Sequence, residues 1–161
     1  MTQQQSHGVG NPAISRWLMM LTYACGVVGL AIGIGTVNGD PPSLTWAVLV
    51  TVGGAGIVSF VRHAMFHRSD AARMGWEFGR TNPFQIETGL ANLAWGLAAV
   101  LTVVFSWGLA AEATVFLVFG LYMLGASVAQ VIYQRGIPMA LGSAVFGGLM
   151  SYVGVTGLMS T

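Results

Sequence analysis

Residues Trp17–Val37 read WLMMLTYACGVVGLAIGIGTV, an apolar run without a charged side chain. A helix needs about 20 mainly apolar residues to cross a lipid bilayer, so this run predicts a transmembrane helix. The whole chain is 55% hydrophobic and only 7% charged, whereas soluble domains carry about 25% charged residues. The composition therefore indicates a protein embedded in the lipid bilayer, which we expect to be the plasma (inner) membrane.

Further runs along the chain meet the same criterion, and turn-forming stretches such as NGDPPS at residues 38–43 separate them. The sequence thus predicts an all-α integral membrane bundle of five transmembrane helices. Residues 1–14 are expected to form a polar tail and residues 15–161 a single membrane domain, with a cytoplasmic interfacial segment at about residues 67–82. The expected spans are residues 17–37, 44–66, 83–105, 109–133 and 139–159.

The distribution of arginine predicts how the helices are oriented, because cytoplasmic loops of membrane proteins are enriched in Lys and Arg. With five spans and a cytoplasmic N-terminus, every arginine of the chain falls on the cytoplasmic side. These residues are Arg16, Arg62, Arg68, Arg73, Arg80 and Arg135. We therefore expect the N-terminus inside and the C-terminus outside. The net charge of +1 offers no basic surface for nucleic acid.

Small residues mark the faces on which the helices are expected to pack. Small side chains four positions apart allow helix backbones to approach closely in lipid. Gly29 and Gly33 have this spacing in the first span, and Ser143, Gly147 and Ser151 have it in the last. These faces predict packing within the bundle or, as the alternative, contacts in a homo-oligomer or in a larger membrane complex.

Most of the polar side chains gather in residues 62–96. The Asn-Pro pair at residues 82–83 is typical of a helix start, and it places Glu87 just inside the third span. Placing an unpaired carboxylate at this position in lipid costs about 3 kcal/mol of free energy. Glu87 is therefore expected to pair with Arg62 or Arg80, or else to bind a proton or a ligand. The expected polar cluster comprises Arg62, His63, Asp70, Arg80, Gln85, Glu87 and Asn92.

His63 and His67, in the stretch HAMFH, would share one face of a helix. With Glu87 as a third ligand they could bind a divalent metal ion. However, the Glu of an H-E-x-x-H motif is absent and no cysteine accompanies the pair. Polar residues at a membrane interface are the simpler interpretation, so no cofactor is predicted and a divalent metal ion stays an alternative.

The segment RHAMFHRSDAARMGWEFGRTNPFQIETGLANLAWG, residues 62–96, resembles the signature of a family of small prokaryotic multi-pass membrane proteins of unknown function. The matching positions are His63, Asp70, Gly75, Trp76, Pro83, Phe84, Gln85, Glu87, Gly89, Ala91 and Asn92. Arg62 stands where the family tends to have glycine. The resemblance implies no activity. It does imply that His63, Gln85 and Glu87 form one constellation, so a His63–Glu87 contact is the leading structural prediction.

Three functions stay open from the sequence. The first is a non-catalytic membrane subunit or self-associating helical bundle, with a cytoplasmic-side polar cluster around His63 and Glu87. The second is a small proton- or ion-coupled transporter or channel that uses the same two residues, since histidine titrates near neutral pH. The third is a metal- or quinone-binding redox accessory protein. The sequence contains no recognisable catalytic set, so enzymatic activity is not expected.

Overall fold

The computed structural model describes residues 10–75, 83–132 and 136–161, and in this part of the chain it contains helices and no strands. The segments from α2 to η2 follow one another without a break and form one long helix. The elements are α1 (Pro12–Thr36), α2 (Thr45–Val48), the π-helical segment η1 (Leu49–Gly54), α3 (Ala55–Phe60), the π-helical segment η2 (Val61–Met65), α4 (His67–Met74), α5 (Pro83–Val104), α6 (Leu109–Ile132) and α7 (Ile137–Met159).

Five helices are long and apolar enough to cross a membrane, as the sequence predicted: Pro12–Thr36, Thr45–Met65, Pro83–Val104, Leu109–Ile132 and Ile137–Met159. The largest difference from the expected bounds is at the first helix, which begins at Pro12 rather than near Trp17. Asn11 caps this helix, because its side-chain oxygen accepts a hydrogen bond from the backbone N–H of Ala13 (2.9 Å). Proline suits the first helical position, where its missing N–H costs nothing.

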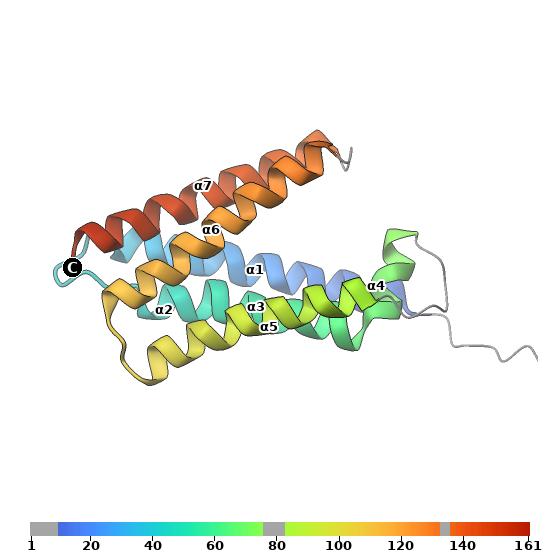
Figure 1. Ribbon diagram of the computed structural model, residues 1–161, viewed down its shortest axis with the longest axis horizontal. Coiled ribbons are helices and arrows are strands. Elements are labelled where there is room, and N and C mark those ends of the chain that lie inside the picture. The colour runs from blue at the N-terminus through green and yellow to red at the C-terminus, as the bar shows by residue number, and fades with distance from the viewer. Residues whose placement is uncertain (1–9, 76–82, 133–135) are drawn as a thin grey trace, which may run out of the picture.

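Figure 1 shows α1, the long helix from α2 to η2, and α5 side by side, with α4 at one end of the bundle and the C-terminus at the other. We call these ends the α4 end and the far end. The α6–α7 hairpin crosses the other helices and diverges from α1 and α5 toward the α4 end (Figure 1). Four arginines lie on elements that meet at the α4 end, and Arg80 and Arg135 lie outside the described residues. The four are Arg16, Arg62, Arg68 and Arg73.

Glycine lets α6 and α7 pack with their backbones almost in contact. A Cβ atom on Gly147 would lie 2.8 Å from the carbonyl oxygen of Gly120, and one on Gly120 would lie 2.8 Å from the backbone nitrogen of Ser151. Ser143 adds a hydrogen bond, since its hydroxyl donates to Oε1 of Gln130 on α6 (3.2 Å). Ser143, Gly147 and Ser151 of α7 therefore face α6 of the same chain.

The small residues of α1 also face helices of the same chain. Gly29 lies against Thr51 in η1, and Gly33 lies against Ala47 in α2 and Val153 in α7. The stripes that the sequence singled out thus contribute to packing within the bundle. A homo-oligomer or a larger complex stays a prediction.

The hairpin is attached to the other helices at the far end. Phe116 of α6 is fully buried there, in a core that includes Leu44 and Val153. The carboxylate of Glu112 accepts hydrogen bonds from the backbone N–H of Leu44 (3.2 Å) and from the hydroxyl of Thr45 (2.7 Å). An acidic group at this position caps the start of α2 and interacts favourably with its dipole.

The close approach of α6 and α7 generates a prediction about two neighbouring glycines. Gly147→Ala should destabilise the protein by about 1–3 kcal/mol, because the added methyl group would force backbones apart. Gly148 is exposed, and a Cβ atom added to it would meet no atom within 4 Å, so Gly148→Ala is the matched control. Both changes raise helix propensity equally. Thermal unfolding in mild detergent should therefore show a lower midpoint for Gly147→Ala alone, and equal midpoints would contradict this packing.

Candidate functional site

The described polar residues at the α4 end are organised around Asp70, whose side chain is fully buried. Its Oδ1 accepts hydrogen bonds from the hydroxyl of Ser15 (2.5 Å) and from Nε and Nη2 of Arg73 (3.1 and 3.0 Å). Its Oδ2 accepts one from the amide of Gln85 (2.7 Å) and lies 3.0 Å from Nδ1 of His63. One carboxylate thus joins α1, η2, α4 and α5, and we call these five residues the Asp70 cluster.

A turn between η2 and α4 brings Asp70 into this position. Phe66 leaves helical geometry, with φ −107° and ψ 30°, and α4 begins at the next residue. Asp70 and Arg73 are three positions apart in α4, a spacing at which helix side chains meet. The helix ends at Gly75, whose φ of 72° is left-handed and typical of glycine after a helix. A short helix with its own start and stop therefore holds the carboxylate next to α1.

Asp70 is surrounded by groups that stabilise its charge. Burial raises the pKa of Asp70, but the contacts with His63 and Ser15 and the charge of Arg62 lower it by more, so that this pKa lies well below the usual range. Arg73 is within hydrogen-bond distance, whereas Nε of Arg62 lies 3.9 Å from Oδ1. A single negative charge therefore faces two guanidinium groups.

His63 connects the Asp70 cluster to Arg62. The Nε2 atom of His63 lies 2.6 Å from Nη2 of Arg62. A guanidinium can only donate hydrogen bonds, so Nε2 is the acceptor in this contact, whereas Nδ1 faces Asp70. The two contacts orient the imidazole from both sides.

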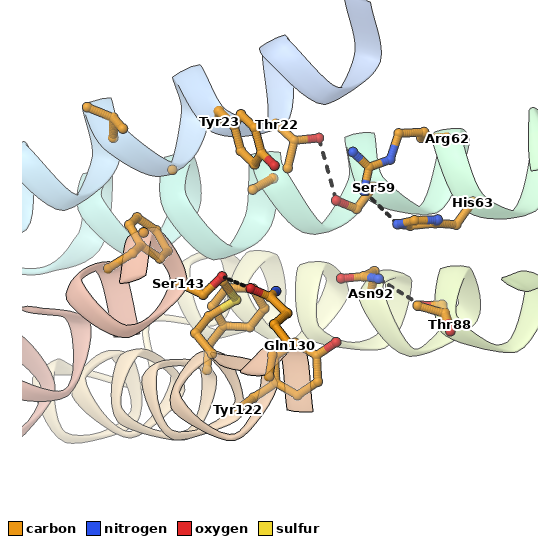
Figure 2. A pocket seen from close by; sticks show the side chains of 18 residues that line it. Thr22, Tyr23, Ser59, Arg62, His63, Thr88, Asn92, Tyr122, Gln130 and Ser143 are labelled. Carbon is orange, nitrogen blue, oxygen red and sulfur yellow. Dashed lines mark hydrogen bonds between the residues drawn. The ribbon is translucent and has the colours of Figure 1, made fainter. Parts of the chain in front are cut away.

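A pocket of about 460 Å³ lies beside these residues, between the α6–α7 hairpin and the helices α1, α3 and α5. Figure 2 shows polar side chains from all of these helices around it. The polar lining residues are Thr22, Tyr23, Ser59, Arg62, His63, Thr88, Asn92, Tyr122, Gln130 and Ser143. The others are Gly26, Val27, Ala55, Phe119, Met123, Ala126, Gly142 and Phe146.

The lining of the pocket changes from polar to apolar along the bundle. The helices run alternately toward and away from the α4 end, so the position of each residue along that axis follows from its number. On α1 and on the long second helix, all polar lining residues are nearer the α4 end than the apolar ones, and on α6 and α7 the same order holds for Gln130 against Phe119 and for Ser143 against Phe146. Examples on the first two are Thr22 against Val27 in α1 and His63 against Ala55 in the long second helix.

The predicted contact between His63 and Glu87 is wrong, because Asp70 occupies that place beside the imidazole. Glu87 is exposed on α5. Gln85 points inward to Asp70, and a side chain two positions later on an α-helix is turned by about 200°. Glu87 therefore points away from the Asp70 cluster. Of the three residues that the resemblance groups together, His63 and Gln85 both contact Asp70, whereas Glu87 does not.

Other members of the predicted polar cluster have mixed outcomes. Arg62 faces His63 and Asp70, so the predicted pair of Arg62 with Glu87 is not formed among the described residues. Asn92 lines the pocket, where its amide donates to the backbone carbonyl of Thr88 (2.8 Å). The other partner predicted for Glu87 is Arg80, which lies outside the described residues.

The predicted metal ligands are not assembled. Nδ1 of His67 lies 3.0 Å from the backbone carbonyl oxygen of Ala64. Within residues 10–75, 83–132 and 136–161, no three His, Cys, Asp or Glu side chains come together as a metal site. The set of His63, His67 and Glu87 therefore has no support from the geometry.

Ser15 and Arg73 belong to the Asp70 cluster although the sequence did not single them out as site residues. One signal could have found Ser15. The Asn-Pro pair at residues 11–12 has the same form as the pair at residues 82–83, and it places Ser15 inside the first turns of a helix. The pocket residues contributed by α6 and α7 carry no comparable local signal, because only the fold brings the hairpin close to Arg62.

The Asp70 cluster predicts opposite outcomes for two acidic residues. Asp70→Asn removes the charge at nearly constant size and leaves Arg62 and Arg73 without a described counter-charge. Removing one partner of a buried ion pair costs about 3–5 kcal/mol, so the thermal midpoint in mild detergent should fall clearly. Glu87→Gln, on the exposed face of α5, is the control and should leave the midpoint unchanged. The reverse order of the two variants would rule out Asp70 as the organising charge.

Comparison with known proteins places the chain in a family. A search of curated proteins found no match, and a search of solved structures found none. Residues 17–136 match the model of a family described as a family of unknown function (DUF6790). The match covers most of the chain, including the Asp70 cluster apart from Ser15, and it confirms the resemblance to a family of unknown function. The protein therefore belongs to the DUF6790 family.

Proposed function

We propose that this protein is a non-catalytic, membrane-embedded binding protein whose pocket holds one small amphipathic molecule. The observation that supports this proposal is the polar-to-apolar gradient in a pocket of about 460 Å³. Pockets that bind small molecules typically measure about 300–1,000 Å³ and combine an apolar lining with a few polar groups that orient the ligand. A molecule with a polar head toward the α4 end and an apolar body toward the middle of the bundle matches this lining.

In this proposal the five long helices cross the plasma membrane, with the α4 end on the cytoplasmic side. The four described arginines at the α4 end support this orientation. Exposed tryptophans support the placement as well, since Trp and Tyr favour the membrane interface. Trp17 is exposed near the α4 end, whereas Trp46 and Trp107 are exposed near the far end.

The geometry favours binding over the two alternatives taken from the sequence. A transporter that uses Glu87 together with His63 would need both residues on one path, but Glu87 is exposed on α5 and does not line the pocket. A metal-based redox accessory would need a ligand set, and the described residues do not assemble the predicted one. Binding in the pocket requires neither Glu87 nor a set of metal ligands, since the hydrogen-bonding side chains of the lining can orient a ligand directly.

A pocket-filling variant tests the proposed function. Gly142 lines the pocket, and a Cβ atom there would meet no atom within 4 Å. Gly142→Leu should therefore fill the pocket and leave the fold intact. Gly148 is equally open but lies outside this lining, so Gly148→Leu is the matched control. Native mass spectrometry in mild detergent should show a bound molecule on the wild type and on Gly148→Leu, and a bare chain for Gly142→Leu.

Two results would contradict the proposed function. One is a bare chain for the wild type after extraction and after addition of amphipathic molecules. The other is an equal amount of bound molecule on Gly142→Leu, which would place the molecule outside the pocket.

Cysteine labelling tests the proposed orientation. Asn38 is exposed in the turn after α1 at the far end, and Arg68 is exposed on α4. In a Cys25→Ala background, a membrane-impermeant thiol reagent applied to intact cells should label Asn38→Cys. It should label Arg68→Cys only after the membrane is permeabilised. Labelling in the opposite order would reverse the orientation.

A further inference from the structure

If the pocket binds a small amphipathic molecule, as proposed above, the charge of the lining residues indicates which charge that molecule carries. Among the described lining residues Arg62 is the permanent cation, and no described lining residue is a carboxylate. The side chains of Arg62 and His63 are largely buried, with 12% and 16% of their surfaces exposed. The pocket therefore presents a positive charge in a mostly apolar setting.

Asp70 neutralises this charge only in part, because Arg73 shares the same carboxylate and has the shorter contacts with it. Arg73 donates two hydrogen bonds to Oδ1 of Asp70, at 3.1 and 3.0 Å, whereas Nε of Arg62 lies 3.9 Å from the same oxygen. The described cluster of one carboxylate and two guanidinium groups thus has an excess of one positive charge.

Arg62 also has hydrogen-bonding capacity that the described residues do not use. Its Nη2 donates to His63 (2.6 Å), and its buried Nε, which lies 3.9 Å from Oδ1 of Asp70, has no hydrogen-bond partner among the described residues. Figure 2 shows Arg62 and His63 on one side of the pocket, with Asn92 and Gln130 on the other. Ser143 donates to the side-chain carbonyl oxygen of Gln130 (3.2 Å), and the amide nitrogen of Gln130 has no acceptor among the described residues, so it can donate to a ligand.

We infer that the ligand is an anionic amphiphile, whose carboxylate or phosphate head group binds Arg62 and whose apolar chain lies along Val27, Phe119 and Phe146. A guanidinium presents paired N–H donors that match the oxygens of these two head groups. Because Arg62 shares the carboxylate of Asp70 with Arg73, part of the desolvation cost of its charge is not offset, and an anionic head group would offset it. A neutral head group would not.

Isothermal titration of the purified full-length protein in a neutral detergent tests this inference. The probes are tetradecyl phosphate, tetradecanoate and the uncharged tetradecanol, together with inorganic phosphate, which has no chain. The two anionic amphiphiles should bind at least about tenfold more tightly than tetradecanol. Inorganic phosphate should bind more weakly than tetradecyl phosphate. Equal binding of inorganic phosphate would identify a free anion as the ligand and overturn the amphiphile.

Two variants test whether Arg62 causes the preference for the anionic probes. Arg62→Gln should lose the preference for the anionic probes over tetradecanol. Arg68→Gln, which changes an exposed arginine on α4, should keep it. Retention of the preference in Arg62→Gln would overturn the inference. If Arg62→Gln does not fold, Gly142→Leu is the test variant instead. It should abolish binding of the anionic probes. Unchanged binding would show that these probes bind at the protein surface and would overturn the inference.

The outcomes separate this inference from the proposed function. If the wild type binds tetradecanol and the anionic probes equally, and Gly142→Leu blocks both, the pocket binds amphiphiles without selecting charge. The proposed function then stands and the inference is wrong. If the wild type binds none of the probes with a chain, both fail.

Discussion

The buried carboxylate of Asp70 connects elements that are far apart in the sequence. Ser15 comes from α1, His63 from η2 and Gln85 from α5, and each contacts an oxygen of the same side chain. An ionised carboxylate without water is stable only if its lone pairs are satisfied by donors or cations. This requirement fixes where α4 lies against the start of α1 and orients His63. The side of the pocket formed by Arg62 and His63 depends on that orientation.

The fold could be predicted from the sequence in its main lines because the signal is compositional. Long apolar runs separated by Gly and Pro specify five helices whatever their neighbours are. The far end of the bundle is harder to predict. Glu112 looks like an acidic residue in the first turn of its own helix, but its carboxylate also caps α2 by accepting from Leu44 and Thr45. Contacts of this kind depend on how distant helices meet, and a linear pattern does not contain that information.

The site could be predicted in part, and the error has a simple physical origin. The sequence indicates residues 62–96 as the polar centre, and His63, Asp70 and Gln85 do meet there. Glu87 is the partner that the resemblance to the family implies for His63. The rotation of an α-helix decides between Gln85 and Glu87, since they point in nearly opposite directions. Only the position of a packing neighbour shows which of the two faces inward, and here that neighbour is α4.

The α6–α7 hairpin is fixed to the bundle at the far end, through Phe116 and the capping contacts of Glu112. Its 24-residue helix α6 is about 36 Å long at 1.5 Å per residue. At this length, a small change in the angle of α6 near Glu112 would shift its opposite end by several ångströms, about 5 Å for a change of about 8°. The pocket lies between this hairpin and the other helices, so its width depends on the angle at which α6 and α7 leave them.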